Sequence, residues 1–600
     1  MDKFIKIVKG LVFLITILLV LKSVFVSRFS VNDGYNLAAT LYLGKVSWVV
    51  LIVALIMGVL KREFFARSVT DLMVLAFALM LYLHSGSLEL YKEQTILLLS
   101  IYFTFRQLTH IERWAKYIVP VALVGAVAAQ LYIAYSQLFA NGVSNHALFA
   151  FTGSFENPGP MCGFVAMLLP ITLYFAFKVD SFPVFENRVL NVILSILKYC
   201  FAAVAIAGAA LVIAGGSRTA LVALIIGAML LYISSNGVDQ IKRLLFAKKG
   251  VVIAVATVLI VAVVGGGYLL FMAKADSAFG RLLLWRTSLS VIAENSFWGV
   301  GLGKFTSCYG DAQAAILSGM EPTDMWVRVA DVPQYAFNEY LHFGVEGGVL
   351  AMLLLIGIFF YTIFRLFKCG SPLGNVYGVS LVVLAIFAFA SYPFHVLPFT
   401  VVATILLAAS VSEFEKGVGV NYDKLICGLA LLFCTINIWR NPHYSDKALR
   451  EWSSERRYYN MDIFKTTVDN YGKLLPTFSD NYAFLFEYGR ALSQTNQYQL
   501  SDSILTLGTR YSKDPMFFNL LGKNAVARSN FNSAEHYIKQ SLTLLPNRHY
   551  PLYLLFDMYL QKGDTVSARY WGERFLNQPP KVNSKFIQEK QTEVRERLRY

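Results

Sequence analysis

Long apolar runs dominate the first 440 residues, and short polar stretches separate them. A helix needs about 20 predominantly apolar residues to cross the hydrocarbon core of a bilayer. The pattern contains thirteen candidate spans, of which the fourth is the shortest, at residues 7–26, 46–60, 69–83, 95–105, 117–139, 161–177, 199–214, 219–233, 251–272, 336–364, 376–390, 396–411 and 425–439. The sequence therefore predicts an all-α class, with a polytopic helical membrane bundle over residues 1–440.

Basic residues in the polar connections fall mainly on one side of this bundle. If the N-terminus is cytoplasmic, the tail and connections on that side, Arg106 among them, hold 20 Lys and Arg. The short connections on the opposite side hold only 4. Cytoplasmic loops of membrane proteins carry such an excess of positive charge. The charges thus predict thirteen spans, with everything after Trp439 outside the cytoplasm.

Two segments depart from this pattern of spans and short connections. One is a predicted outer loop of about 63 residues, 273–335, whose three tryptophans argue against disorder. The other is the polar tail, 441–600, in which Leu521 and Ala534 recur 34 residues later as Leu555 and Ala568. That period is typical of tetratricopeptide repeats, which stack paired helices into an α-solenoid. We expect such a solenoid to share few contacts with the bundle, and a generic domain of helical hairpins is the alternative.

Composition and charge narrow the possible classes of protein. Apolar residues make up 56% of the chain and charged residues 15%, with a mean hydropathy of +0.53. These values exclude a wholly soluble enzyme and a disordered scaffold. The net charge of +15 is spread between apolar runs, so it favours membrane topology and no nucleic-acid partner. The six cysteines form no CxxC pair, and they predict neither a metal site nor redox chemistry.

Four polar stretches on the predicted outer side hold the residues with chemical potential. They are residues 152–160 with Asn157, residues 215–219 with Ser217 and Arg218, residues 280–303 with Arg281, Arg286 and a Gly-Val-Gly-Leu-Gly run, and residues 335–348 with Asn338, Glu339 and His342. Taken alone, each has an ordinary explanation, such as an arginine reaching lipid headgroups or a packed interior histidine. Arg281 and Arg286 are five residues apart, so at most one is expected to face a site with Arg218.

In this order and topology, the four stretches resemble the O-antigen ligase and polymerase superfamily of bacterial membrane glycosyltransferases, over roughly residues 130–399. The matching features are Thr-Gly-Ser-Phe-x-Asn-Pro, a Ser-Arg pair that opens a span, Gly-Arg-x-x-x-Trp before Gly-Val-Gly, and Asn-Glu-Tyr-Leu at a span entry. The resemblance implies transfer of a glycan from undecaprenyl pyrophosphate, on the outer face of the bacterial inner membrane. The acceptor would be lipid A core, another repeat unit or a protein Ser or Thr.

The resemblance also implies roles for individual residues. It implies that Arg218 and Arg281 bind the donor pyrophosphate, because guanidinium groups bind such anions through forked, charge-assisted hydrogen bonds. The other residues expected to bind substrate are Ser217, Asn157, Asn338 and Arg286. No Asp-rich motif lies on the predicted outer face, so we expect metal-independent chemistry without a cofactor.

One position departs from the family pattern. The family often has a histidine directly before the asparagine, as the proposed base for the acceptor hydroxyl, and here that position is Phe337. Phenylalanine cannot accept a proton, which leaves Glu339 and His342 as candidate bases. Glu346 follows His342 by four residues and is placed to orient its imidazole. Glu339 is expected nearer the aqueous end of the span. The alternative without a catalytic role is a solvated carboxylate at a helix N-terminus. A mechanism with little need for a base is the other alternative.

The sequence thus favours a ligase with a periplasmic repeat domain that docks a protein acceptor or partner. Two alternatives stay open: a polymerase of surface polysaccharide, and a non-catalytic membrane scaffold that presents the repeats. A transporter is disfavoured, because its spans would carry ionisable residues at mid-membrane.

Overall fold

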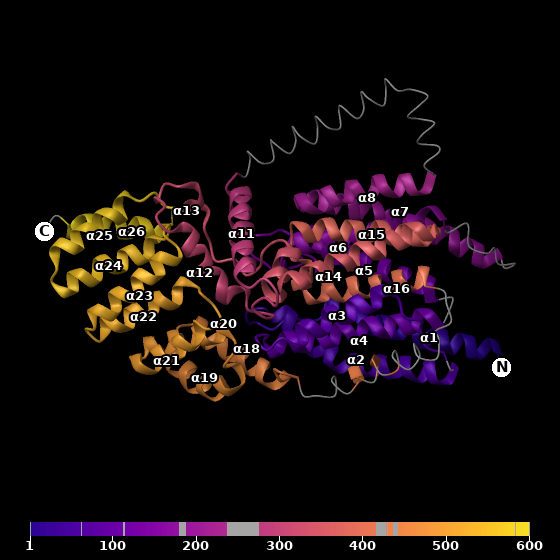
Figure 1. Ribbon diagram of the computed structural model, residues 1–600, viewed down its shortest axis with the longest axis horizontal. Coiled ribbons are helices and arrows are strands. Elements are labelled where there is room, and N and C mark those ends of the chain that lie inside the picture. Colours follow the sequence, from indigo (N-terminus) through magenta and orange to yellow (C-terminus); the bar gives the residue numbers. More distant parts are fainter. Residues whose placement is uncertain are drawn as a thin grey trace, which may run out of the picture.

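The computed structural model describes residues 2–61, 63–111, 115–178, 188–236, 275–415, 428, 430–431, 433–435, 442–581 and 584–598. Every regular element in these ranges is a helix, which confirms the predicted all-α class. Figure 1 shows a bundle of long helices on one side and a stack of shorter helices on the other. A group of loop helices, with α11 nearly upright in this view, lies between them.

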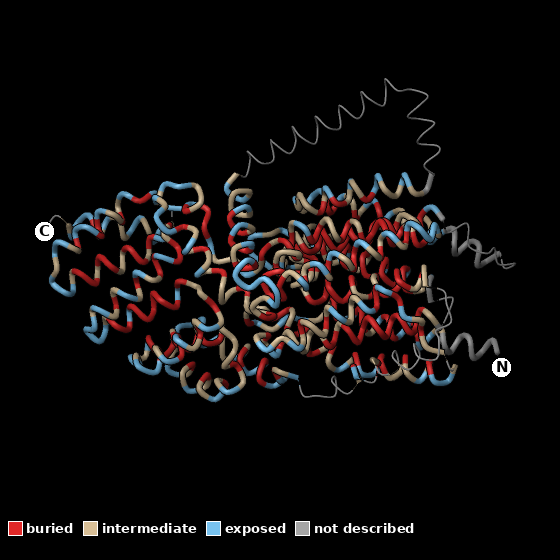
Figure 2. Tube along the Cα trace, in the orientation of Figure 1, coloured by how far each residue is buried: buried red, intermediate tan, exposed pale blue. Residues whose placement is uncertain are grey.

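The bundle is built from the apolar runs of the first 415 residues. Its helices are α1 (Asp2–Leu21), the short 3-10 helix η1 (Lys22–Phe25), α2 (Gly34–Lys61), α3 (Val69–Leu83), α4 (Glu89–Ile111), α5 (Ala115–Phe139), α6 (Pro158–Lys178), α7 (Arg188–Ala214), α8 (Arg218–Asn236), α14 (Glu339–Cys369), α15 (Pro372–Phe389), η3 (Pro393–His395) and α16 (Leu397–Phe414). Helix α15 packs against α6, α8 and α14, while α4 packs against α2 and α16. Figure 2 shows the buried positions concentrated along these helices.

Seven of the described helices are long and apolar enough to cross a membrane, and three shorter ones are also apolar. The helical membrane bundle is thereby confirmed. The predicted span at 251–272 and most of the one at 425–439 lie outside the described residues. The short run at 95–105 is the centre of α4, whose ends are polar. The count of thirteen spans therefore stays a prediction.

Arg106 is not the loop cation that the charge pattern suggested. It lies inside α4 with 1% of its surface exposed, and its guanidinium donates to both carboxylate oxygens of Asp71 at 2.8 and 2.9 Å. Asp71 also completes a capping box with Ser68 at the start of α3. A buried arginine needs such a paired acid, and here the pair joins α3 to α4. This ion pair lies at the end of the bundle away from the repeats.

The tail is a stack of paired antiparallel helices. They are α18 (Asp446–Asn460), α19 (Phe464–Phe478), α20 (Tyr482–Gln494), α21 (Tyr498–Gly508), α22 (Pro515–Ala527), α23 (Phe531–Leu544), α24 (His549–Lys562), α25 (Thr565–Asn577) and α26 (Lys585–Arg597). Within the best-matching repeat, Ala525 and Ala534 are fully buried between α22 and α23. At Gly522, any side chain would collide with Ile538 of α23. The small residues therefore set the close spacing of this pair.

The predicted outer loop contains α11 (Ala275–Glu294), α12 (Phe305–Leu317) and α13 (Met325–Val329), and it lies against one edge of the repeats. That edge is formed by the turns between successive helix pairs. Asn547 donates to the carbonyl groups of Val327 and Ala330, both at 2.9 Å. The backbone N–H of Lys513 donates to the carbonyl of Thr306 at 3.0 Å.

The bundle itself also contacts the first repeats. Arg456 donates to the carbonyl of Ser30 at 3.1 Å, and the backbone N–H of His443 donates to Glu93 at 3.0 Å. Leu37 and Leu90 of the bundle share a hydrophobic cluster with the tail residue Trp452. The tail therefore makes more contacts than expected, because α18 and His443 meet the bundle while later inter-repeat turns meet the outer loop.

Candidate active site at the repeat-facing end

Two predicted arginines meet where α8 begins and α11 passes the end of the bundle. Arg218 is the first residue of α8, and Arg281 lies in the second turn of α11. Burial lowers the pKa of Arg281, and the positive charge of Arg218 lowers it further, so the two guanidinium groups lie close enough to repel. The guanidinium carbon of Arg281 is also 5.8 Å from the centre of the Phe337 ring. The structure thus brings Arg218, Arg281 and Phe337 together.

Phe337 stands at the position where the family often has a histidine. The backbone there places the Phe337 ring near Arg281 and starts α14 at Asn338. Phe337 has φ of 48°, a left-handed conformation that is unfavourable for a bulky residue. Asn338 returns to extended backbone, and its side chain accepts from the N–H of Leu341 at 3.1 Å, which caps α14. The Phe337 ring therefore contacts Arg281, while Asn338, 4% exposed, begins the helix.

Glu339 lies in the first turn of α14 but is not solvated. Its side chain is 1% exposed, and one carboxylate oxygen lies 2.9 Å from Nδ1 of His395. The carboxylate also accepts from the backbone N–H of Phe394. The alternative of a solvated helix-entry carboxylate is therefore wrong, because the connection between α15 and α16 folds over this residue.

His342 and Glu346 form the contact that their spacing predicts. Nε2 of His342 lies 3.3 Å from Oε1 of Glu346, and both side chains are 3% exposed. Nδ1 of His342 accepts from the N–H of Ala336 at 3.3 Å, while the ring stacks on Phe305 with centroids 4.7 Å apart. Glu346 in turn accepts from the N–H of Phe305 at 3.2 Å.

A break in α14 holds Glu346 in this position. Gly348 has φ of 75°, which interrupts the helix two residues after Glu346. The carbonyl of Glu346 accepts instead from the N–H of Gly301 at 2.8 Å, and the N–H of Val349 donates to Ser296 at 2.8 Å. The Gly-Val-Gly-Leu-Gly run makes this possible, because Gly299, Gly301 and Gly303 all adopt positive φ.

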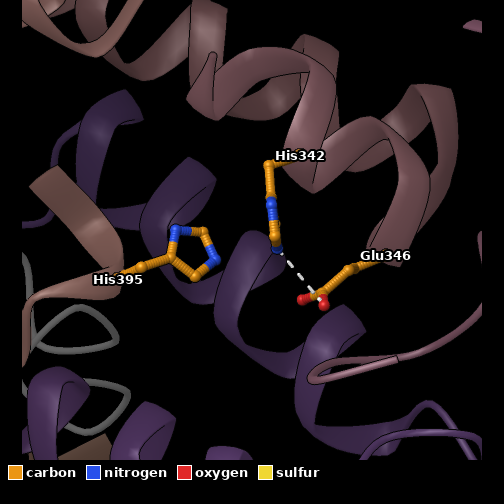
Figure 3. Close-up of side chains that lie close together, drawn as sticks. All are labelled: His342, Glu346 and His395. Carbon is orange, nitrogen blue, oxygen red and sulfur yellow. Dashed lines mark ion pairs between the residues drawn. The ribbon is translucent and has the colours of Figure 1, made fainter. Parts of the chain in front are cut away.

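The sequence reasoning missed His395, the last residue of η3. Its ring centroid lies 3.8 Å from that of His342, and Figure 3 shows it facing His342 and Glu346 from the opposite side. Burial lowers the pKa of His395, but the carboxylates of Glu339, Glu346 and Asp33 outweigh it, so its pKa is raised above the ordinary value. The only signal in the sequence was a histidine in a short connection between two apolar runs.

We call Glu339, His342, Glu346 and His395 the histidine–carboxylate cluster. A row of aromatic rings lies between this cluster and the arginine pair. Phe337 lies 5.1 Å from Tyr392, which stacks on Tyr335 at 5.0 Å, and Tyr335 lies 4.9 Å from His395. The structure therefore brings the two predicted bases together through His395, and among the described residues these rings link them to the arginine pair.

Three other predicted residues have local partners. Asn157 accepts from the N–H of Gly159 at 2.8 Å at the start of α6. The carbonyl of Ser217 accepts from the N–H of Leu221 at 3.0 Å at the start of α8. Arg286 is exposed, and its guanidinium carbon lies 5.8 Å from the centre of the Trp326 ring. A role in substrate binding stays a prediction for each of them.

Two cavities border the histidine–carboxylate cluster. A mostly apolar cavity of about 200 Å³ lies among α3, α4, α14, α15 and α16. A more polar cavity of about 80 Å³ lies among the bundle, the outer loop and the first repeats. Tyr91, Tyr335, Glu346 and His395 line both cavities, so the cluster lies where the apolar cavity of the bundle meets the polar cavity on the repeat side.

The region that contains most of these residues matches a known family. Residues 202–356 match the family model described as O-antigen ligase. The O-antigen ligase stretch includes Arg218, Arg281, Glu339, His342 and Glu346. It confirms the resemblance predicted from the motifs, and it supports membrane glycan transfer of the ligase or polymerase kind.

Comparison with solved structures finds a weak similarity. A structure titled "Functional Characterization of Pseudomonas Aeruginosa pilF" is 17% identical in sequence. The match covers 29% of this chain and 76% of the chain in that structure. Its TM-score is 0.22, so this similarity carries no argument about function. No curated protein matches the chain.

Proposed function

We propose that the protein transfers a glycan from undecaprenyl pyrophosphate to an acceptor on the outer face of the bacterial inner membrane, with its repeat domain in the periplasm. The acceptor is lipid A core or a protein Ser or Thr, as in an O-antigen ligase. The match over residues 202–356 supports the class of reaction, and the arginine pair supports the chemistry of the donor.

The observation that carries this proposal is the position of Arg281, which is half-buried over the Phe337 ring and feels the positive charge of Arg218. Two like charges that meet at a half-buried position destabilise each other, and an anion between them relieves that repulsion. A pyrophosphate has the charge and the oxygen acceptors that two guanidinium groups bind best. In a site shielded from water, the same contacts stabilise the charge that develops on the leaving group.

We assign activation of the acceptor to the histidine–carboxylate cluster as a unit. Phe337 provides no proton acceptor at the family position, and its ring contacts Arg281 instead. Of the two candidate bases, Glu339 holds Nδ1 of His395, and His342 has a backbone donor on Nδ1. The proton of the acceptor hydroxyl therefore passes to a coupled group that faces both cavities.

The repeat domain has two roles in this proposal. Its inter-repeat turns hold the outer loop, which carries Arg281, and its remaining surface docks a protein acceptor or an assembly partner. The division at residue 440, between a catalytic membrane domain and a repeat domain, belongs to the same proposal.

The test is transfer by arginine variants in a strain that lacks the gene. Arg218→Ala and Arg281→Ala are expected to abolish addition of glycan to the acceptor while the protein stays inserted in the membrane. Arg328→Ala is the control, because this exposed arginine of the outer loop pairs with Asp276. Full transfer by Arg281→Ala would refute the proposed donor site.

The same strains separate the ligase from its alternatives. A polymerase would leave single repeat units on the acceptor when the gene is deleted, whereas a ligase would leave the acceptor bare. A non-catalytic scaffold would tolerate Arg218→Ala and Arg281→Ala equally.

A further inference from the structure

We propose that His342, Glu346 and His395 bind a divalent transition-metal ion of the Zn²⁺ type. Each residue offers one ligand atom, and these three atoms lie within 4.8 Å of one another. Two imidazoles and a carboxylate are a ligand set that suits zinc, with bonds of about 2.0–2.2 Å. This departs from the metal-independent chemistry that the sequence favoured.

The His342–Glu346 pair already has the spacing of two ligands. Its 3.3 Å separation is close to the roughly 3.4 Å between adjacent ligands of a tetrahedral zinc site. Although the two groups are close, Nε2 of His342 is buried and is not aligned for a hydrogen bond to any group in the described chain. Buried nitrogens normally have a partner, and a metal ion would supply one.

His395 is oriented as a ligand by Glu339. Metal-binding histidines usually hold one ring nitrogen against a carboxylate, which leaves the other nitrogen for the ion. Here Nδ1 of His395 faces Glu339 at 2.9 Å, and the ring approaches His342 on its other side (Figure 3). Glu339 is thus a positioning residue, fixed in turn by the N–H of Phe394.

The charge of the cluster also favours a divalent cation. Glu339 and Glu346 are both nearly fully buried, and two carboxylates at this depth require compensation. A protonated His395 would balance one negative charge, whereas an ion with two positive charges balances both.

Binding would give up one interaction. An ion on Nε2 of His342 requires Nδ1 to carry the ring proton, so the N–H of Ala336 has to release that nitrogen. At 3.3 Å this hydrogen bond is long, and it is the weakest of those that hold the cluster. Because Glu346 and His395 line both cavities, the ion would keep an open side toward them.

The test is binding of Zn²⁺ alone to full-length protein, purified in detergent and treated with a chelator. We expect one high-affinity ion per chain by calorimetry and by elemental analysis. His342→Gln, Glu346→Gln and His395→Gln should each weaken that affinity at least 100-fold. His536→Gln is the matched control, because this histidine is exposed on α23, and it should leave the affinity unchanged.

A conservative variant covers the case in which a ligand variant fails to fold. Glu339→Gln keeps all three ligands and should weaken the affinity by about 10–100-fold, as loss of an orienting carboxylate does. The visible spectrum of Co²⁺-loaded protein should show four-coordinate binding, and this signal should disappear in His395→Gln. Absence of a stoichiometric ion in the parent, or unchanged binding in His395→Gln, would overturn the proposal.

The ion and the donor site fail separately, although a bound ion would occupy His342, Glu346 and His395 and so replace their role as a base. Metal binding needs neither donor nor acceptor, so it can hold even if Arg281→Ala transfers normally. Conversely, a chain without a bound ion would leave the arginine pair and its anion untouched.

Discussion

The arginine pair and the histidine–carboxylate cluster lie at the same end of the bundle, yet they handle charge in opposite ways. The arginines bring two like charges together at a half-buried position. The cluster brings two carboxylates against two imidazoles and buries all four side chains almost completely. Like charges that approach indicate a ligand of the opposite sign, whereas a buried and internally paired group indicates tight positioning of its members. The comparison therefore separates binding of the donor from activation of the acceptor.

The largest effect is expected in the cluster. Glu339→Gln keeps the shape of the side chain but removes the charge that faces Nδ1 of His395. Transfer should fall by about 10²–10⁴-fold, the range for loss of acid–base catalysis, with donor binding intact. Glu156→Gln, an exposed residue 3.7 Å from Arg28, is the control. Transfer within a few-fold of the parent in both Glu339→Gln and His342→Gln would remove the cluster from the reaction.

Conservative arginine variants should lose less transfer activity than the cluster variants, and the loss should depend on the planar shape of the guanidinium group. Arg281→Lys keeps the charge and loses the planar fork, so it should rescue poorly and leave a loss of about 10²–10³-fold in kcat/KM. Donor binding should weaken together with transfer, unlike in the cluster variants. Arg328→Lys, in an exposed pair with Asp276, should behave as the parent. Equal rates for Arg281→Lys and the parent would show that charge alone suffices.

A third prediction concerns the break in α14 that holds the cluster. Gly348→Ala places a Cβ against the backbone carbonyl of Phe297 at a φ of 75°. The strain should cost about 1–3 kcal/mol and lower the thermal midpoint of the membrane domain. Gly370→Ala is the comparison, because its φ is 66° but the space around it is open. Gly348→Ala should therefore be the less stable of the two.

The fold was largely predictable because lipid imposes a simple pattern. Apolar runs located the helices of the bundle, and the 34-residue period located the pairs of the tail. Arg106 was misplaced because a linear sequence does not show that Asp71 lies beside it in the folded chain. The same limit hid His395, whose partners Glu339 and His342 come from a helix more than 50 residues earlier.

The burial of Glu339 could not be predicted for a related reason. A carboxylate at a helix N-terminus is usually solvated, and only the fold of the α15–α16 connection covers this one. The arginines were easier to place, because a helix start and a helix face are local properties. Local spacing therefore predicted the contact between His342 and Glu346, but not the contacts that the α15–α16 connection makes with Glu339.

A fourth prediction tests how the outer loop is held near Arg281. Asn547→Ala leaves the carbonyl of Val327 without its side-chain donor, while the carbonyl of Ala330 keeps the one from Lys581. Loss of a partner for buried backbone groups should cost about 1–3 kcal/mol, seen as faster amide hydrogen exchange in the outer loop. Asn530→Ala, which removes a helix cap on α23 far from the loop, should leave exchange there unchanged.

The smallest effect is a pH dependence at the same edge. Burial raises the pKa of Asp331, but Lys581 and Arg548 outweigh it and keep the pKa below its ordinary value. A lowered pKa in the folded state stabilises the protein above the unfolded value of about 3.9. That contribution is lost as the pH falls through the folded value. Asp331→Asn should therefore flatten the acid side of the stability profile slightly, and an unchanged profile would exclude this contribution.

The regular spacing of the inter-repeat turns has a mechanical consequence. Contacts to the outer loop recur at Lys513, Asn547 and Lys581, so these contact points are one repeat of 34 residues apart. Insertion of a whole repeat would move every later contact point by the length of one repeat, while the outer loop would keep its length. The repeat domain can therefore change its residues freely, but it cannot change the number of repeats that precede Lys581 without losing contacts to the outer loop. Evolutionary drift in this tail is expected to preserve the count of units more strictly than their sequence.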